Sequence, residues 1–192
     1  KNEESDIFKK LTKKPDWRID RQPETLAKFA GQEMAKENGP LASVITVDRF
    51  DTHARQDIDT QGQLSEQLSI VDKIIASYRE GLGEKAWNKS IILTLTEFGR
   101  TVLENGSTGT DHGYASAGLL AGGAIEKSGV ITQWPGLKTK DQYEGRDLMS
   151  TIDYRSVCAA CIEKTLGLDH DLIANKVFYT PKLPRIYNNL FS

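Results

Sequence analysis

The sequence predicts an α/β fold with three layers, in which a mainly parallel sheet carries helices on both faces. Two short apolar runs, residues 41–47 and 91–95, have the composition of buried strands, and a long amphipathic helix is predicted between them over residues 61–82. Buried strands joined by a crossover helix are typical of a parallel pair. Polar motifs follow both runs directly, where the sites of such sheets lie.

The size and charge of the chain fit one sizeable domain. It has 192 residues, 25 Lys plus Arg against 27 Asp plus Glu, a net charge of −2 and a mean hydropathy of −0.47. Near-neutral charge argues against a protein that coats nucleic acid. We also predict no membrane span, because no apolar run approaches the roughly 18–20 residues that a bilayer requires.

The predicted organisation is a charged N-terminal segment over residues 1–22 followed by a single α/β domain over residues 23–192. The first residue is Lys1, and the opening segment has no apolar stretch of the signal-peptide kind. We therefore expect the chain to be part of a longer protein.

Each predicted element has a local reason. Apolar residues recur at helical spacing over residues 23–38, with Pro23 in the first turn and Gly39-Pro40 as the stop. The helix over residues 61–82 carries one apolar stripe and ends at Gly81 and Gly83.

Downstream of the second apolar run, residues 105–123 form a loop rich in glycine, and residues 119–130 can add a short strand. Residues 141–147 form a polar loop. A further helix is predicted over residues 148–166, with Ser150 or Thr151 as its cap and Gly167 at its end. Residues 178–191 read as an extended tail held by aromatic side chains.

The two cysteines, Cys158 and Cys161, leave three interpretations open. A redox pair needs a thiol of low pKa at a helix N-terminus, whereas Cys158 falls in mid-helix. A zinc knuckle needs a second ligand pair, which no further cysteine supplies. The interpretation that we favour is two small side chains on a buried helix face.

The candidate chemistry lies in three clusters of acids and histidines. Asp51 and His53 follow the first apolar run, Glu97 follows the second, and Asp111 with His112 lies in the glycine-rich loop. Carboxylates with imidazoles favour Zn²⁺, Mn²⁺ or Fe²⁺, and carboxylates alone favour Mg²⁺ or Ca²⁺. We therefore predict a divalent cofactor, Zn, Mn or Ca, held by these five residues.

Arg100 and His170 receive opposite interpretations. Arg100 follows Glu97 by three residues, and its guanidinium can grip a phosphate or sulfate oxyanion, so it is the predicted catalytic residue. Simpler alternatives stay open, namely local turns around the Asp-His pairs and a salt bridge between Glu97 and Arg100. His170 is predicted to be a solvated loop residue.

Four motifs together resemble a bacterial family. They are residues 50–53 (Phe-Asp-Thr-His), residues 96–101 (Thr-Glu-Phe-Gly-Arg-Thr), residues 105–113 around Asp111-His112-Gly113, and residues 153–155 (Asp-Tyr-Arg). Their order and spacing resemble the domain of unknown function family 1501, in its C-terminal portion. That family is related to the alkaline phosphatase and sulfatase superfamily.

The resemblance implies an alkaline phosphatase-like fold, divalent metals and hydrolysis of phosphate or sulfate esters. Asp51 and His53 resemble one metal-binding group of the superfamily, Glu97 a second, and Asp111 with His112 the last. It also implies export to the periplasm and a nucleophile from an upstream strand.

We expect a metal-dependent hydrolase of small anionic esters whose site is incomplete without that upstream segment. The alternative is a non-catalytic exported binding domain that retains a degenerate metal site.

Overall fold

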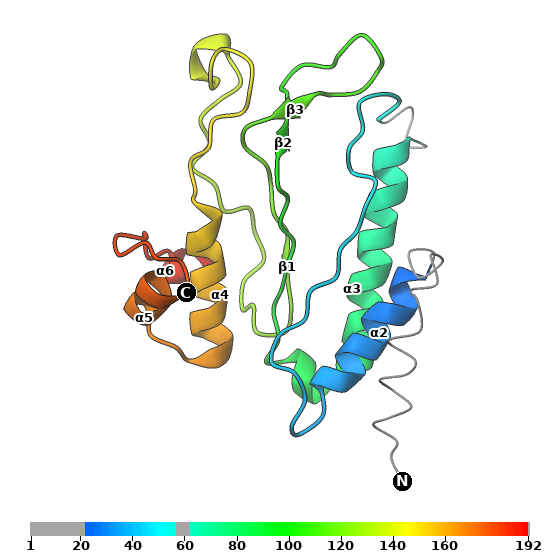
Figure 1. The fold of residues 1–192 in the computed structure, drawn as a ribbon, viewed down its shortest axis with the longest axis vertical. Helices are drawn as coiled ribbons and strands as arrows, with labels where there is room; N and C mark the ends of the chain where they lie inside the picture. Colours follow the sequence, from blue (N-terminus) through cyan, green and yellow to red (C-terminus); the bar gives the residue numbers. More distant parts are fainter. Residues whose placement is uncertain (1–21, 57–61, 192) are drawn as a thin grey trace.

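The computed structural model describes residues 22–56 and 62–191. The charged segment predicted over residues 1–22 lies outside them apart from Gln22. Figure 1 shows extended central segments with helices on either side, α2 and α3 on one side and α4 to α6 on the other. The helical elements are α2 (Pro23–Met34), α3 (Gln63–Trp87), η2 (Thr139–Asp141), α4 (Tyr154–Leu166), α5 (His170–Lys176) and α6 (Tyr187–Phe191).

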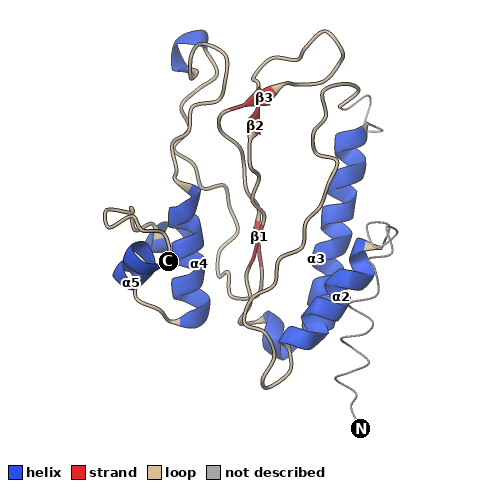
Figure 2. Cartoon of the chain, in the orientation of Figure 1, coloured by secondary structure: helices blue, strands red, loops and turns tan. Residues whose placement is uncertain are grey.

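The predicted parallel sheet is wrong. In the described residues the strands form only two small antiparallel pairs, which Figure 2 shows in red. Strand β1 (Ile92–Leu93) pairs with β4 (Leu120–Ala121), and β2 (Gly99–Arg100) pairs with β3 (His112–Gly113). The fold is therefore helix-rich rather than a three-layer α/β sandwich.

The run over residues 41–47 shows why the prediction failed. These residues are described throughout and form no strand, and the side chains of Leu41 and Val44 are 78% and 93% exposed. Ile45 and Val47 instead pack against α2 and α3. An apolar run indicates which residues tend to be buried, but it does not determine which other strand pairs with them through backbone hydrogen bonds. The partner of β1 is β4, further along the chain.

In the described residues, clusters of buried apolar side chains lie on both sides of the central segments. Ala27 of α2 packs with Ile74, Tyr78 and Leu82 of α3, and Ile92 of β1 joins them. On the opposite side, Ala160 packs with Leu190 and Phe191, and the partly buried Ile91 and Leu120 lie against that group. Successive residues of an extended chain point to opposite faces, so Ile91, directly before β1, and Ile92 within it contact different helical groups.

The three predicted helices are present, but their ends differ from the prediction by up to six residues, most of all at the start of α4. Helix α2 begins at Pro23 as expected and ends at Met34, and α3 runs from Gln63 to Trp87. Gly83 has φ 66° and ψ 166°, so α3 kinks at a predicted stop and then continues. Gly167 ends α4 in the left-handed conformation with φ 66°.

Three local predictions need correction. The cap of α4 is Asp153 rather than Ser150 or Thr151, because its carboxylate accepts from the backbone N–H of Arg155 at 2.9 Å. The tail is not extended throughout, since it ends in α6. His170 is not solvated: it is 6% exposed, and its Nε2 donates to the carbonyl of Leu183 at 3.0 Å.

Asp153→Ala is expected to lower the free energy of unfolding by about 1 kcal/mol at pH 7, since α4 loses its cap. The Arg155 guanidinium donates to Asp153 and also to the Thr180 hydroxyl, at 2.6 and 3.1 Å, and so ties this cap to the tail. Hydrogen bonding to Arg155 lowers the pKa of Asp153. The contribution is therefore present above the ordinary pKa and lost as the pH falls below about 4.

Urea unfolding of both proteins across pH checks this expectation, with Thr151→Ala as the matched control. Thr151 is exposed and is one of the two caps that the sequence predicts, so its replacement should leave the unfolding midpoint unchanged. A larger loss for Thr151→Ala than for Asp153→Ala would contradict the assignment of the cap.

Candidate metal centre

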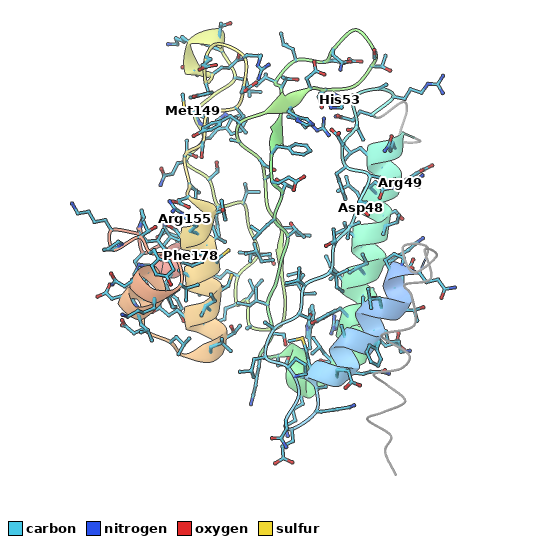
Figure 3. The ribbon with its side chains drawn as sticks, viewed as in Figure 1. Asp48, Arg49, His53, Met149, Arg155 and Phe178 are labelled. Atoms are coloured by element: carbon cyan, nitrogen blue, oxygen red, sulfur yellow. The ribbon has the colours of Figure 1, made fainter. Side chains whose placement is uncertain are left out.

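Two loops meet at one end of the molecule and form the candidate site. The backbone N–H groups of Arg55 and Gln56 donate to the carbonyls of Ser107 and Thr108 at 3.1 and 2.9 Å. In return, the N–H of Thr110 donates to the carbonyl of Thr52 at 3.2 Å. Residues 52–56 and 107–110 are thus held side by side, although about fifty residues separate them in sequence. Figure 3 shows His53 near β3, at this meeting point.

The meeting of the loops brings three candidate ligands together. Oδ1 of Asp51 lies 2.8 Å from Nε2 of His112 and 3.0 Å from Nε2 of His53. One ligand atom from each residue lies within 4.8 Å of the others. The three side chains are about half exposed, between 47% and 55%. This group is therefore compact and open to solvent on one side.

The donor set fits a divalent transition metal. Two imidazole nitrogens and one carboxylate oxygen are the usual protein ligands of catalytic zinc and of non-haem iron. Ligand atoms about 2.1 Å from one ion lie about 3.0 Å apart in octahedral coordination and about 3.4 Å apart in the tetrahedral coordination usual for zinc. The separations of Asp51 from His53 and His112, 3.0 and 2.8 Å, are nearer to the octahedral spacing. Three protein ligands also leave coordination positions for water or substrate.

The second nitrogen of His53 also contacts a carboxylate. Nδ1 of His53 lies 3.0 Å from Oδ1 of Asp111, and only the ring can donate there because a carboxylate accepts. A neutral imidazole with its proton on Nδ1 presents a lone pair at Nε2, and that atom faces Asp51. A lone pair and a carboxylate 3.0 Å apart repel each other, so the contact between Nε2 and Asp51 requires either a second ring proton or a bound cation between the two atoms.

Asp111 therefore lies behind His53 rather than in the three-residue ligand group, although the sequence predicted it as a ligand. Carboxylates that orient a metal-bound imidazole in this way are common around metal sites. Asn105 supports Asp111: its Nδ2 lies 3.1 Å from Asp111 Oδ1 and 2.9 Å from the carbonyl of His53. Its Oδ1 accepts from the N–H groups of Ser107 and Gly109. Asn105 thus organises its own loop and fastens it to the loop of His53.

The charges of the site are set by its hydrogen bonds. The hydrogen bond to His112, followed by that to Arg100, lowers the pKa of Asp51. The hydrogen bonds to His53 and Asn105 lower the pKa of Asp111. Both carboxylates are consequently ionised at neutral pH, as metal binding requires.

Arg100 forms hydrogen bonds with both loops. Its Nη2 donates to Asp51 Oδ1 and to the carbonyl of Phe50, at 2.8 and 2.6 Å, and its Nη1 donates to the carbonyl of Thr110 at 2.9 Å. Its side chain is 20% exposed. The guanidinium therefore positions Asp51 and lies within reach of the ligand group. Its predicted contact with a substrate oxyanion stays a prediction.

Phe98 holds the third ligand in place, a role that the sequence did not reveal. Its ring stacks on His112 with the centroids 4.0 Å apart, and Arg100 lies over the same ring at 5.0 Å. Glu97, its neighbour, is exposed and lies outside the group of three ligands. Its predicted role as a ligand stays a prediction.

The cysteine pair lies away from this site, on α4. Burial raises the pKa of Cys158, and it raises the pKa of Cys161 to about 12. Both thiols are free and stay protonated at neutral pH. This favours the interpretation of the pair as packing residues over a redox pair.

None of the helices in the described ranges is long and apolar enough to cross a membrane.

Comparison with known proteins places the chain in a family. The family model described as "Protein of unknown function (DUF1501)" matches residues 9–172. Neither the curated proteins nor the solved structures include a match. Because the family model covers most of the sequence, including every candidate ligand, the chain belongs to the DUF1501 family.

Proposed function

We propose that the chain binds one divalent metal ion through Asp51, His53 and His112 and acts with it on phosphate or sulfate esters. The observation that carries this proposal is the pair of contacts made by His53. Its Nδ1 donates to Asp111, while its Nε2 faces Asp51 at 3.0 Å. A cation held between His53 and Asp51 satisfies both side chains at once.

A metal ion in this position supplies Lewis-acid chemistry, polarising an ester oxygen or lowering the pKa of a bound water. The protein would hold and orient the residues that bind the metal. Asp111 holds the imidazole of His53 in the tautomer that binds metal, and Phe98 fixes the plane of His112. Arg100 keeps Asp51 ionised and directed at the site. The open, half-exposed side of the ligand group is where an anionic ester can approach.

The nucleophile is proposed to come from outside the described residues. The hydroxyls of Thr52 and Thr110 both donate to Oε1 of Gln56, and that of Thr108 donates to the carbonyl of Ser107. These three hydroxyls are thus engaged in holding the loops. We therefore expect slow ester hydrolysis by this chain alone, as the resemblance to the alkaline phosphatase and sulfatase superfamily also implies.

A non-catalytic binding domain with a degenerate metal site is the second candidate. The engagement of Arg100 favours it, because that guanidinium already bonds to two carbonyls and Asp51. Such a guanidinium has less capacity to stabilise a transferring group than a free one.

Hydrolysis of 4-nitrophenyl phosphate and 4-nitrophenyl sulfate tests the proposal. With Zn²⁺ or Mn²⁺ added, we expect slow turnover that chelation removes and that His53→Ala abolishes. Turnover that is equal with and without metal, or equal in His53→Ala, would refute the hydrolase. Metal binding without any turnover would select the non-catalytic domain, and fast turnover would show that the chain holds its own nucleophile.

A further inference from the structure

A second polar hollow lies beside the candidate metal centre. It has a volume of about 400 Å³ and is formed by the loop that carries Asp51 and His53 together with the start of α3. Ala54, the neighbour of His53, is part of its wall. The polar side chains of its lining come from Arg49, Arg55, Gln63, Glu66 and Gln67.

The two arginines are held at this hollow by one residue. Nε2 of Gln63 donates to the carbonyl of Arg49 at 2.9 Å, and the backbone N–H of Gln63 donates to the carbonyl of Arg55 at 3.5 Å. Both ends of the ligand-bearing loop are therefore fastened to the first turn of α3. Figure 3 shows Arg49 beside that helix.

The backbone at both arginines is unusual. Arg49 has φ 73° and Arg55 has φ 50°, which place two non-glycine residues in the left-handed region. That conformation is unfavourable for an L-residue. It turns the chain at each end of the loop, so that Asp51 and His53 face the metal centre and the arginines line the hollow.

The described lining of the hollow carries two arginines and a single carboxylate. Within the described residues, no salt bridge joins Arg49 or Arg55 to a carboxylate, although Glu66 lies in the same wall. Gln67 is 3% exposed, and none of the described residues forms a hydrogen bond with its carboxamide. A carboxamide in the wall of a hollow can donate to a group bound there.

We propose that this hollow is an anion subsite that takes a second phosphate or sulfate group of the substrate. The proposal rests on the function proposed above, since the ester itself would lie at Asp51, His53 and His112. Guanidinium groups pair with tetrahedral oxyanions through two parallel N–H bonds, and the Gln67 carboxamide can donate a further bond. Substrates with two anionic groups would then be preferred over simple monoesters.

Inorganic sulfate is the probe for this subsite. Its binding is detected through the NMR signals of the arginine side-chain Nε–H groups. In the zinc-loaded protein, we expect sulfate to shift the signals of Arg49 and Arg55 with saturation in the millimolar range. The double variant Arg49→Gln/Arg55→Gln should weaken binding by at least about tenfold, and Gln67→Leu by about tenfold. Arg79→Gln, an exposed arginine further along α3, is the matched control and should change nothing.

His53→Ala separates this proposal from the metal site. We expect it to lose metal but to keep the sulfate response of Arg49 and Arg55. Shifts that do not saturate, or equal weakening by Arg79→Gln, would overturn the subsite whatever the metal content. If the wild-type chain binds sulfate at the arginines but never binds metal, the proposed function fails while the anion site stands.

Discussion

Replacing His112 with alanine is expected to lower the affinity for Zn²⁺ by more than about 100-fold. Loss of a residue that only hydrogen-bonds to a metal ligand already lowers metal affinity by about 10–100-fold, and loss of the ligand itself should have a larger effect. The variant removes one of the three proposed ligands, since Nε2 of His112 lies 2.8 Å from Oδ1 of Asp51 in the unmodified chain. Phe98 would also lose its stacking partner. Equilibrium dialysis followed by elemental analysis measures the bound metal.

Two carboxylate variants serve as comparisons for the metal affinity of His112→Ala. Asp111→Asn should weaken metal binding by about 10–100-fold, because it disturbs the tautomer of His53 without removing a ligand. Asp72→Asn makes the same chemical change on the exposed surface of α3 and should have no effect. Stoichiometric zinc in His112→Ala would exclude the proposed centre, and equal loss in all three variants would indicate unfolding instead.

Helices were predictable from sequence because their causes are local. Pro23 at the start of α2 and Gly167 at the end of α4 act within one turn of the chain, and the apolar stripe of α3 is a repeating pattern. The strands were not predictable in the same way. A strand is defined by its partner, and the register of Ile92 opposite Ala121 depends on residues far away in sequence.

The residues of the candidate site also differ in how far the sequence predicts them. Asp51, His53 and His112 were identified as chemically suitable residues, and the structure brings these three together. The positions of Asp111 and Asn105 depend on contacts across more than fifty residues, such as the bond from Asn105 to the carbonyl of His53. Such contacts carry no local sequence signal.

His170 illustrates the limit of composition as a guide. It is flanked by Asp169 and Asp171, which predicted a solvated loop. Asp169 instead caps α5, accepting from the backbone N–H groups of Asp171 and Leu172, and this directs the ring of His170 inward. The two charged neighbours of His170 thus belong to the start of a helix and do not show that His170 is exposed.

Gly109→Ala is expected to abolish metal binding, because the two loops could no longer approach each other. A Cβ atom at Gly109 would lie 2.3 Å from the carbonyl carbon of His53 and 2.6 Å from the N of Ala54, both backbone atoms. No side-chain rotation relieves contacts with backbone, so the loops must separate. Separation would break the bonds that Ser107 and Thr108 accept from the opposite loop and move His53 away from Asp111.

Gly106→Ala is the matched control for this experiment. It lies in the same loop, and a Cβ atom there would meet nothing within 4 Å. Zinc titration of both variants, with circular dichroism to compare their helix content, separates the outcomes. Helices α2 and α3 pack in a core away from this loop, so Gly109→Ala should keep its helical signal while losing the metal. Tight zinc binding by Gly109→Ala would show that the ligands do not depend on contact between the loops, and the geometry proposed for His53 would then be wrong.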